Sequence, residues 1–305
     1  MQRYVLMRFL QALVTLLLVS ILVFWLARVS GDPLHMLLPI EATAEDFAQA
    51  RKNYGLDKPL SVQYFIYIAN AVRGDFGNSI KAKIPVSTMI GQRVPNSLRL
   101  AGFSLMISLF LALILGVAAA VKRGSIIDSI SRIIAVSGMS IPAFWLGVMF
   151  ILVFGVELRL LPVFGAEGIA HYVLPGCVLG WTFSAALMRL VRSSMLEVLD
   201  SEYVKLARLK GVAEWQVIWK HALRNALIPV ITFAGLYFCQ IAGGVVIVET
   251  VFAWPGLGLL AYEALLWKDY PVIQGAVLFM CAVVLTINLG VDILYAYINP
   301  KIRYQ

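Results

Sequence analysis

A chain of 305 residues that is 61% hydrophobic and 14% charged, with a mean hydropathy of +0.85, is too apolar for a soluble globular protein, whose usual shares are about 45–50% and about 25%. Soluble enzymes and nucleic-acid-binding modules are therefore excluded, and the net charge of +8 has to be interpreted from its distribution along the chain. Cys177, Cys239 and Cys281 lie far apart in apolar runs without metal-ligand or disulfide spacing, so we interpret them as small apolar side chains.

Six stretches are long and apolar enough to cross a membrane, which takes about 20 residues at a rise of about 1.5 Å per residue. They are residues 9–27, 100–121, 133–154, 172–188, 228–248 and 272–297. The first is longer than the core of a signal peptide and no cleavage site follows it, so we expect it to remain as an anchor. The fourth contains Pro175, Gly176 and Gly180, and its small residues suit close helix packing in lipid. The sequence therefore predicts an all-α integral membrane protein with six transmembrane helices.

Lysine and arginine residues in the short connections predict the orientation, because these residues are enriched on the cytoplasmic side. With the N-terminus inside, 14 of the 25 basic residues lie on the inner side. They are Arg3, Arg8, Lys122, Arg123, Arg132, Arg189, Arg192, Lys205, Arg208, Lys210, Lys220, Arg224, Lys301 and Arg303. The short outer loops contain only Arg159 and Lys268, so both termini are predicted to be cytoplasmic.

The chain is expected to have three parts: residues 1–28 with the first span, an external segment over residues 29–99, and a five-span core over residues 100–305. The external segment contains a capping-box-like Thr43-Ala-Glu-Asp, which predicts a helix through Arg51, and a second apolar stretch over residues 64–72. Two interpretations stay open for it: a cap that stabilises the bundle, or a docking surface for a soluble partner.

The internal connection over residues 189–227 predicts two helices. From Ser201 the pattern indicates a capped amphipathic helix that ends at Gly211 in a left-handed conformation. Its apolar face is expected to contain Tyr203, Leu206, Ala207 and Leu209. A second helix over residues 214–226 leads to the fifth span. A short cytoplasmic helix tied at both ends to spans can transmit a partner's movement, and the alternative is an interfacial helix on anionic lipid.

Rare polar residues inside the spans are candidates for a translocation pathway, although interhelical hydrogen bonds explain them almost equally well. These candidates are Ser137, Ser140, Gln240, Asn288 and Asp292. Asn288 and Asp292 share a helical face, and the position of Asp292 near the cytoplasmic end favours a structural ion pair over a gate.

Other polar and small residues give weaker signals. Gly243 and Gly244 suggest close backbone packing or a bend in the fifth span. The turn that begins at Trp254 is interpreted either as a loop toward the pathway or as an interfacial aromatic anchor. The histidines His35, His171 and His221 have no ligand spacing, so no metal site is expected from this chain alone. The sequence contains no nucleophile–base constellation and no HExxH helix, so no catalytic residue is predicted.

Several strings in chain order resemble one transporter family. Tyr203-Val-Lys-Leu-Ala-Arg-Leu-Lys-Gly211 and His221-Ala-Leu-Arg-Asn-Ala-Leu-Ile-Pro229 are similar to the cytoplasmic loop of permease subunits of binding-protein-dependent ABC importers, in the dipeptide, oligopeptide and nickel branch. The similarity covers nearly the whole chain. It includes Gly31-Asp-Pro33, Tyr54-Gly-Leu-Asp-Lys-Pro59, Gly74-Asp-Phe-Gly77, Arg93-Val-Pro-Asn-Ser97, Glu249-Thr-Val-Phe-Ala-Trp-Pro-Gly-Leu-Gly258, Asp269-Tyr-Pro-Val-Ile-Gln274 and Asn299-Pro-Lys-Ile-Arg303.

The resemblance implies the type I importer permease fold, in which the chain forms half of a pathway in the cell inner membrane. The implied partners are a homologous second permease, two ATPase subunits that hold ATP and magnesium, and a periplasmic or extracellular substrate-binding protein; this chain would need no cofactor of its own and would not bind nucleic acid. Its implied coupling loop to the ATPase contains Glu202, Tyr203, Lys205, Ala207, Arg208, Lys210, Gly211, Glu214, His221, Arg224 and Asn225.

The loop departs from the general importer pattern at Lys205, which stands in place of glutamate, and at His221 and Arg224, which stand in place of isoleucine and proline. Di- or oligopeptides are the first substrate expectation, with nickel chelates, glutathione or opine-like solutes as alternatives. An ATP-independent secondary carrier is the alternative of a different class.

Overall fold

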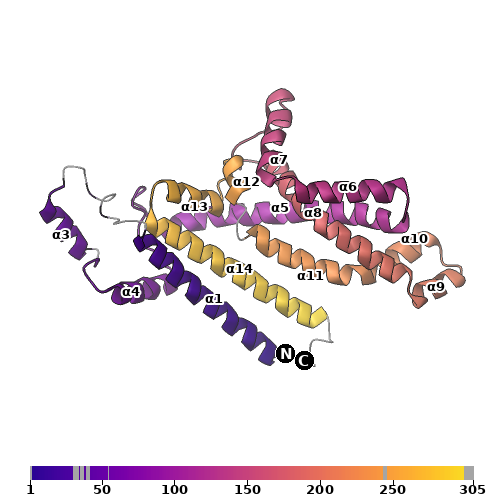
Figure 1. Ribbon diagram of the computed structural model, residues 1–305, viewed down its shortest axis with the longest axis horizontal. Helices are drawn as coiled ribbons and strands as arrows, with labels where there is room; N and C mark the ends of the chain where they lie inside the picture. Colours follow the sequence, from indigo (N-terminus) through magenta and orange to yellow (C-terminus); the bar gives the residue numbers. More distant parts are fainter. Residues whose placement is uncertain are drawn as a thin grey trace. The chain divides into compact units, whose positions relative to one another are not determined.

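A computed structural model describes residues 2–29, 34, 38, 42–53, 55–242 and 246–298 (Figure 1). In these residues the secondary structure is helical, apart from an isolated antiparallel bridge between Asn78 and Pro85, which confirms the all-α prediction. Several sequence landmarks lie outside the described residues: Gly31, Asp32, Pro33, His35, Tyr54, Gly243, Gly244 and residues 299–303.

Five helical segments within the described residues are long and apolar enough to cross a membrane. They are α1 (Gln2–Val29), α5 (Val86–Val121), α8 (Ile169–Leu199), α14 (Tyr270–Ile298), and the continuous helix formed by α10 (Glu214–Gln216), η2 (Val217–Ala222) and α11 (Leu223–Ala242). A bent pair supplies the sixth span when it is counted as one. It consists of α6 (Ile126–Ser140) and α7 (Ala143–Phe150), which η1 (Ile151–Glu157) extends.

The predicted third span, residues 133–154, is wrong as a single straight helix. The chain bends by 103° between α6 and α7, at Ile141 and Pro142, where Ile141 has the extended angles φ −83° and ψ 121°. Proline has no amide hydrogen for the helix ladder, and its ring disfavours the helical conformation of the preceding residue. For the predicted fifth span, residues 228–248, the structure describes α11 up to Ala242 and α12 (Val246–Val251), and residues 243–245 lie outside the described part of the chain.

The chain forms two compact units, of which the first contains residues 1–97 and 255–289. Its further helices are α3 (Ala44–Asn53), α4 (Leu60–Val72) and α13 (Leu257–Leu266). The predicted capping box is confirmed: the backbone amide of Thr43 donates to Oδ2 of Asp46 at 2.8 Å, and the Asp46 amide donates to Oγ1 of Thr43 at 3.3 Å. Buried Asp269 accepts hydrogen bonds from the Ser79 hydroxyl and the amides of Ile80 and Lys81, which fixes the loop before α5.

The second unit contains residues 98–254 and 290–305, and α8 is its central helix, in contact with α6, α7, α11 and η2. Glycines allow the close packing. A Cβ atom built at Gly180 would lie 2.5 Å from Cγ2 of Ile107 in α5, and one built at Gly138 in α6 would lie 2.9 Å from the Trp181 carbonyl oxygen. The small residues of the fourth span therefore allow close helix packing, as the sequence predicted.

Candidate functional site

The predicted cytoplasmic helix is α9 (Glu202–Leu209), which lies between α8 and α10 at one end of the second unit (Figure 1). Lys210 caps it, and Gly211 follows with φ +75°, the left-handed conformation that the sequence predicted. The expected side-chain cap at Ser201 is wrong, because its hydroxyl donates to the Val198 carbonyl oxygen instead of accepting from the first turn of α9.

The buried face of α9 differs from the predicted one. Val204 and Ala207 are buried, at 0% and 9% exposure, and Val204 belongs to a core cluster that contains Leu199 and Val217. Leu206 and Leu209 are 52% and 84% exposed, although the sequence pattern placed both with Ala207. A short helix that is already packed by one face, and that presents large apolar side chains on another, has a surface suited to a protein partner.

Two ion pairs organise the charges of α9. Lys205 Nζ lies 2.9 Å from Oε1 of Glu202, and this carboxylate raises the pKa of the Lys205 ammonium. Arg208 donates two hydrogen bonds to Glu214, from Nη2 at 2.7 Å and from Nε at 3.2 Å, and this contact raises the pKa of the Arg208 guanidinium. The Arg208 pair spans the turn at Gly211 and joins α9 to α10. Because both pairs are exposed, they set geometry more than stability.

The remaining residues of the implied coupling loop gather on the same connection. Nδ2 of Asn225 donates to the Tyr203 hydroxyl at 2.7 Å, which ties α11 to α9, and also to the His221 carbonyl oxygen at 3.4 Å. Lys210 and Arg224 are exposed. The structure thus brings Tyr203 and Asn225 together across 22 positions of sequence.

Sequence reasoning missed two exposed tryptophans beside α9. Trp215 in α10 is 63% exposed and Trp219 in η2 is 54% exposed. They lie 13 and 9 residues before Ile228, where the apolar stretch begins, which is about 20 Å and about 14 Å along the helix. Interfacial tryptophans sit at the lipid headgroups, and the headgroup regions together add only about 10–15 Å to the hydrocarbon core. Both side chains are large exposed apolar groups on the segments that directly follow α9. The sequence signal for both residues was tryptophan within a basic segment that is predicted to be cytoplasmic.

The predicted pathway residues lie on three helices, α6, α11 and α14, and their role in a pathway stays a prediction. Ser137 and Ser140 line an open groove of about 660 Å³ on α6, together with Arg132, Ile133 and Val136 among others. The Ser137 hydroxyl donates to the Ile134 carbonyl oxygen of its own helix at 2.8 Å. The other three candidates do not line this groove: Gln240 is exposed on α11, and Asn288 and Asp292 are half-buried on α14. The ion pair expected for Asp292 stays a prediction.

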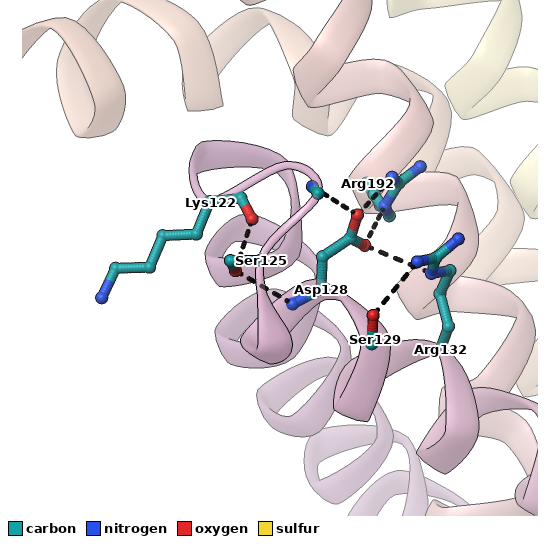
Figure 2. A network of polar contacts seen from close by, with 7 residues as sticks. Lys122, Ser125, Asp128, Ser129, Arg132 and Arg192 are labelled. Carbon is teal, nitrogen blue, oxygen red and sulfur yellow. Dashed lines mark hydrogen bonds and ion pairs between the residues drawn. The ribbon is translucent and has the colours of Figure 1, made fainter.

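A polar network that the sequence did not single out lies at the turn between α5 and α6 (Figure 2). Asp128, whose side chain is 2% exposed, accepts hydrogen bonds from Arg192 Nε at 2.8 Å, from Arg192 Nη2 at 2.9 Å and from the Gly124 amide at 3.0 Å. Arg132 Nε lies 3.6 Å from the same carboxylate. Asp128 precedes the apolar stretch that begins at Ile133. An acidic residue in the first turn after Ser125, within a basic segment, was the available signal.

The structure describes Trp254 and two of the three histidines, His171 and His221. Trp254 is fully buried, with its ring 4.5 Å from that of Tyr172, so the interpretation as an interfacial anchor is wrong. Among the described residues, no group of three or more His, Cys, Asp or Glu side chains is arranged to hold a metal ion.

Comparison with known proteins identifies the class. Residues 112–304 match the family described as "Binding-protein-dependent transport system inner membrane component", and residues 1–101 match the N-terminal family of such membrane components. The protein is thus a multi-pass inner-membrane permease subunit of an ABC importer. It belongs to the family of binding-protein-dependent transport permeases.

Individual relatives agree over the full length. The chain is 44% identical over 306 residues to the glutathione transport system permease protein GsiC of Escherichia coli K12 and to that of Salmonella typhi, covering 100% of each chain. The inward-facing MetNI methionine ABC transporter has a similar fold, with a TM-score of 0.58, 21% identity, and coverage of 69% of this chain and 96% of that chain. An amino acid ABC transporter gives a TM-score of 0.54, 14% identity, and coverage of 69% and 94%.

Proposed function

We propose that this permease subunit forms half of the translocation pathway for short peptides, and that glutathione is the first substrate to test. Two findings support this substrate class: the full-length relatives at 44% identity are named as glutathione permeases, and the loop strings are similar to the dipeptide, oligopeptide and nickel branch. Glutathione is itself a tripeptide, so both findings agree on a small peptide. Nickel chelates and opine-like solutes are the competing cargoes.

The proposed assembly contains a homologous second permease, two ATPase subunits that bind ATP and magnesium, and a substrate-binding protein. In the proposed topology both termini are cytoplasmic and residues 29–99 form the external segment. The second unit then carries α9 on the cytoplasmic side, where the ATPase subunits bind.

The observation that carries the proposed coupling role is the set of exposed apolar side chains on α9, α10 and η2. Leu206, Leu209, Trp215 and Trp219 are each more than half exposed, while Val204 anchors α9 to the core cluster and Ala207 is buried. We name these four exposed side chains the docking surface. Basic residues at its margin, Lys210 and Lys220, favour a partner surface with acidic groups.

The docking surface has a direct mechanical connection to the membrane. The helix from Glu214 to Ala242 continues through a π-helical segment without a break. Arg208 and Asn225 tie α9 to this helix. When ATP binding closes the ATPase dimer, a displacement of α9 therefore moves α11 and α8, as rigid-body gating requires.

Uptake into proteoliposomes tests the proposal. The complete complex, reconstituted with its ATPase subunits and binding protein, is expected to accumulate labelled glutathione with ATP inside the cytoplasmic-side compartment and not with a non-hydrolysable analogue. A dipeptide and a nickel–histidine chelate compete as alternative cargoes. Accumulation of the nickel chelate and not of either peptide would contradict the substrate assignment. Uptake without ATP would indicate a secondary carrier and contradict the coupling role.

A further inference from the structure

We propose that Asp128 and Arg192 are positioning residues that join α6 to α8, so that a movement of α9 reaches the groove on α6. This inference rests on the proposed function, because it assigns how the coupling movement spreads inside the subunit. Neither residue belongs to the docking surface or lines the groove.

The first step is the geometry of the pair. Asp128 and Arg192 are 64 positions apart in sequence, and the guanidinium contacts both carboxylate oxygens, at 2.8 Å and 2.9 Å. Two parallel hydrogen bonds fix the mutual orientation of the groups as well as their distance. The Gly124 amide contacts Oδ2 of the same carboxylate at 3.0 Å. Figure 2 shows these contacts converging on Asp128 from the turn and from α8.

The second step is the position of the pair along α8. Arg192 lies seven residues, or about two helical turns, before the end of α8 at Leu199. Only Asp200 and Ser201 separate that end from α9. The pair therefore joins α6 to the part of α8 that a displacement of α9 reaches first.

A second close contact between α6 and α8 lies farther along both helices. Gly138 lies against the backbone of Trp181, and a Cβ atom there would lie 2.9 Å from the Trp181 carbonyl oxygen. From Asp128 to Gly138 the chain advances 10 residues along α6, and from Trp181 to Arg192 it advances 11 residues along α8, which correspond to about 15 Å and about 17 Å. The matching lengths describe two antiparallel helices held at both ends of their contact.

The helix α6 has two faces with different surroundings. Its buried residues are Asp128, Ser131, Ala135 and Gly138, which recur at helical spacing. The groove residues include Arg132, Val136, Ser137 and Ser140 on the remaining surface. One face of α6 is thus packed while another lines the groove. A displacement of α8 consequently carries the groove with it as long as the buried face stays attached.

The fully buried residues of α6 are small or polar, and half-buried Ile134 also packs against the core cluster. The bidentate pair specifies the register at its end of this interface, since its two hydrogen bonds do not survive a shift of one turn.

Loss of the pair is expected to uncouple the movements of α6 and α8 while both helices stay folded. The variants Asp128→Asn and Arg192→Gln keep similar side-chain volumes and remove one charge each. Lys122→Gln is the matched control, because it removes a charge from the same turn and its exposed side chain extends away from the carboxylate in Figure 2. The double variant Asp128→Asn with Arg192→Gln tests whether the two residues act as one unit.

Transport per ATP is the functional measurement. In the reconstituted complex with its binding protein and glutathione, each single variant is expected to lower glutathione transported per ATP hydrolysed by about fivefold or more, with ATP hydrolysis retained. The double variant is expected to match the singles instead of multiplying their effects, and Lys122→Gln to behave as the native protein. Native transport per ATP in both single variants would overturn the proposal. A parallel fall in transport, ATP hydrolysis and folded protein would also overturn it, since that result indicates a structural role only.

A distance measurement keeps the test independent of the substrate. Spin labels at Ser140→Cys on α6 and Ser193→Cys on α8, both exposed, are introduced after Cys177, Cys239 and Cys281 are replaced by alanine. The native pair is expected to give one narrow distance distribution that ATP binding leaves unchanged, and Asp128→Asn a broader or nucleotide-dependent one. Equal distributions in both proteins would overturn the joint even if glutathione proves to be transported. A missing glutathione uptake in the native complex would count against the proposed function alone.

Discussion

Loss of the two exposed leucines of α9 is expected to weaken ATPase binding strongly. Full burial of a leucine side chain is worth about 1.5–3 kcal/mol relative to exposure. Scaled by the exposed fractions of 52% for Leu206 and 84% for Leu209, the pair supplies about 2–4 kcal/mol when a partner covers it. Because about 1.4 kcal/mol corresponds to a tenfold change in Kd, the double variant Leu206→Ser with Leu209→Ser is expected to bind roughly 30-fold to 1000-fold more weakly.

The assay is the Kd of the ATPase subunits for the permease pair in lipid nanodiscs. Val204, which anchors α9 to the core cluster, and buried Ala207 stay unchanged in the variant, so its thermal unfolding temperature is expected to remain native. Leu160→Ser is the matched control, because Leu160 is 67% exposed and lies in a loop outside the docking surface. A Kd within threefold of the native value, with a native control, would refute the assignment of this surface.

Two further outcomes are expected from the local geometry of glycines. Gly211→Val places a β-branched residue at φ +75°, at a cost of about 1–2 kcal/mol. This variant is expected to lower transport per ATP while membrane insertion stays intact. Gly168→Ala, where a Cβ meets no atom within 4 Å, is the control and is expected to leave transport per ATP unchanged. Gly180→Val forces a methyl group into a neighbouring isoleucine, so the thermal unfolding temperature should fall by the equivalent of about 1–3 kcal/mol, whereas Gly102→Ala, which meets no neighbour, serves as the control.

The sequence predicted local features most successfully where a single physical rule acts over a few residues. The capping box at Thr43 formed because its two side chains and two amides lie within one helical turn. Gly211 ends α9 as expected, because only glycine reaches a left-handed conformation without steric cost. The long apolar stretches likewise predicted most of the spans, since their length in residues is set by the thickness of the hydrocarbon core.

The predictions that failed depended on which residues are neighbours in the folded protein. Pro142 stands within an apolar run that reads as one span, and proline is tolerated in many transmembrane helices, so composition alone did not indicate a bend of 103°. The orientation of α9 was also undetermined, because both Val204 and Leu206 fit a helical apolar stripe with Ala207. Contact with the cluster that contains Leu199 and Val217 selects Val204 and leaves Leu206 outside.

The sequence by itself determined the membrane-spanning class, the approximate spans, the short helix before Gly211 and the family resemblance. Hydropathy, helix-ending signals and motifs each depend on residues that are consecutive in the chain. The tertiary structure alone decided the bent third span, the outward apolar surface of α9 and the pair of Asp128 with Arg192, which are 64 positions apart. Burial and hydrogen-bond partners are properties of neighbours in space, and a helix with two possible apolar faces acquires one buried face only when the rest of the unit packs against it.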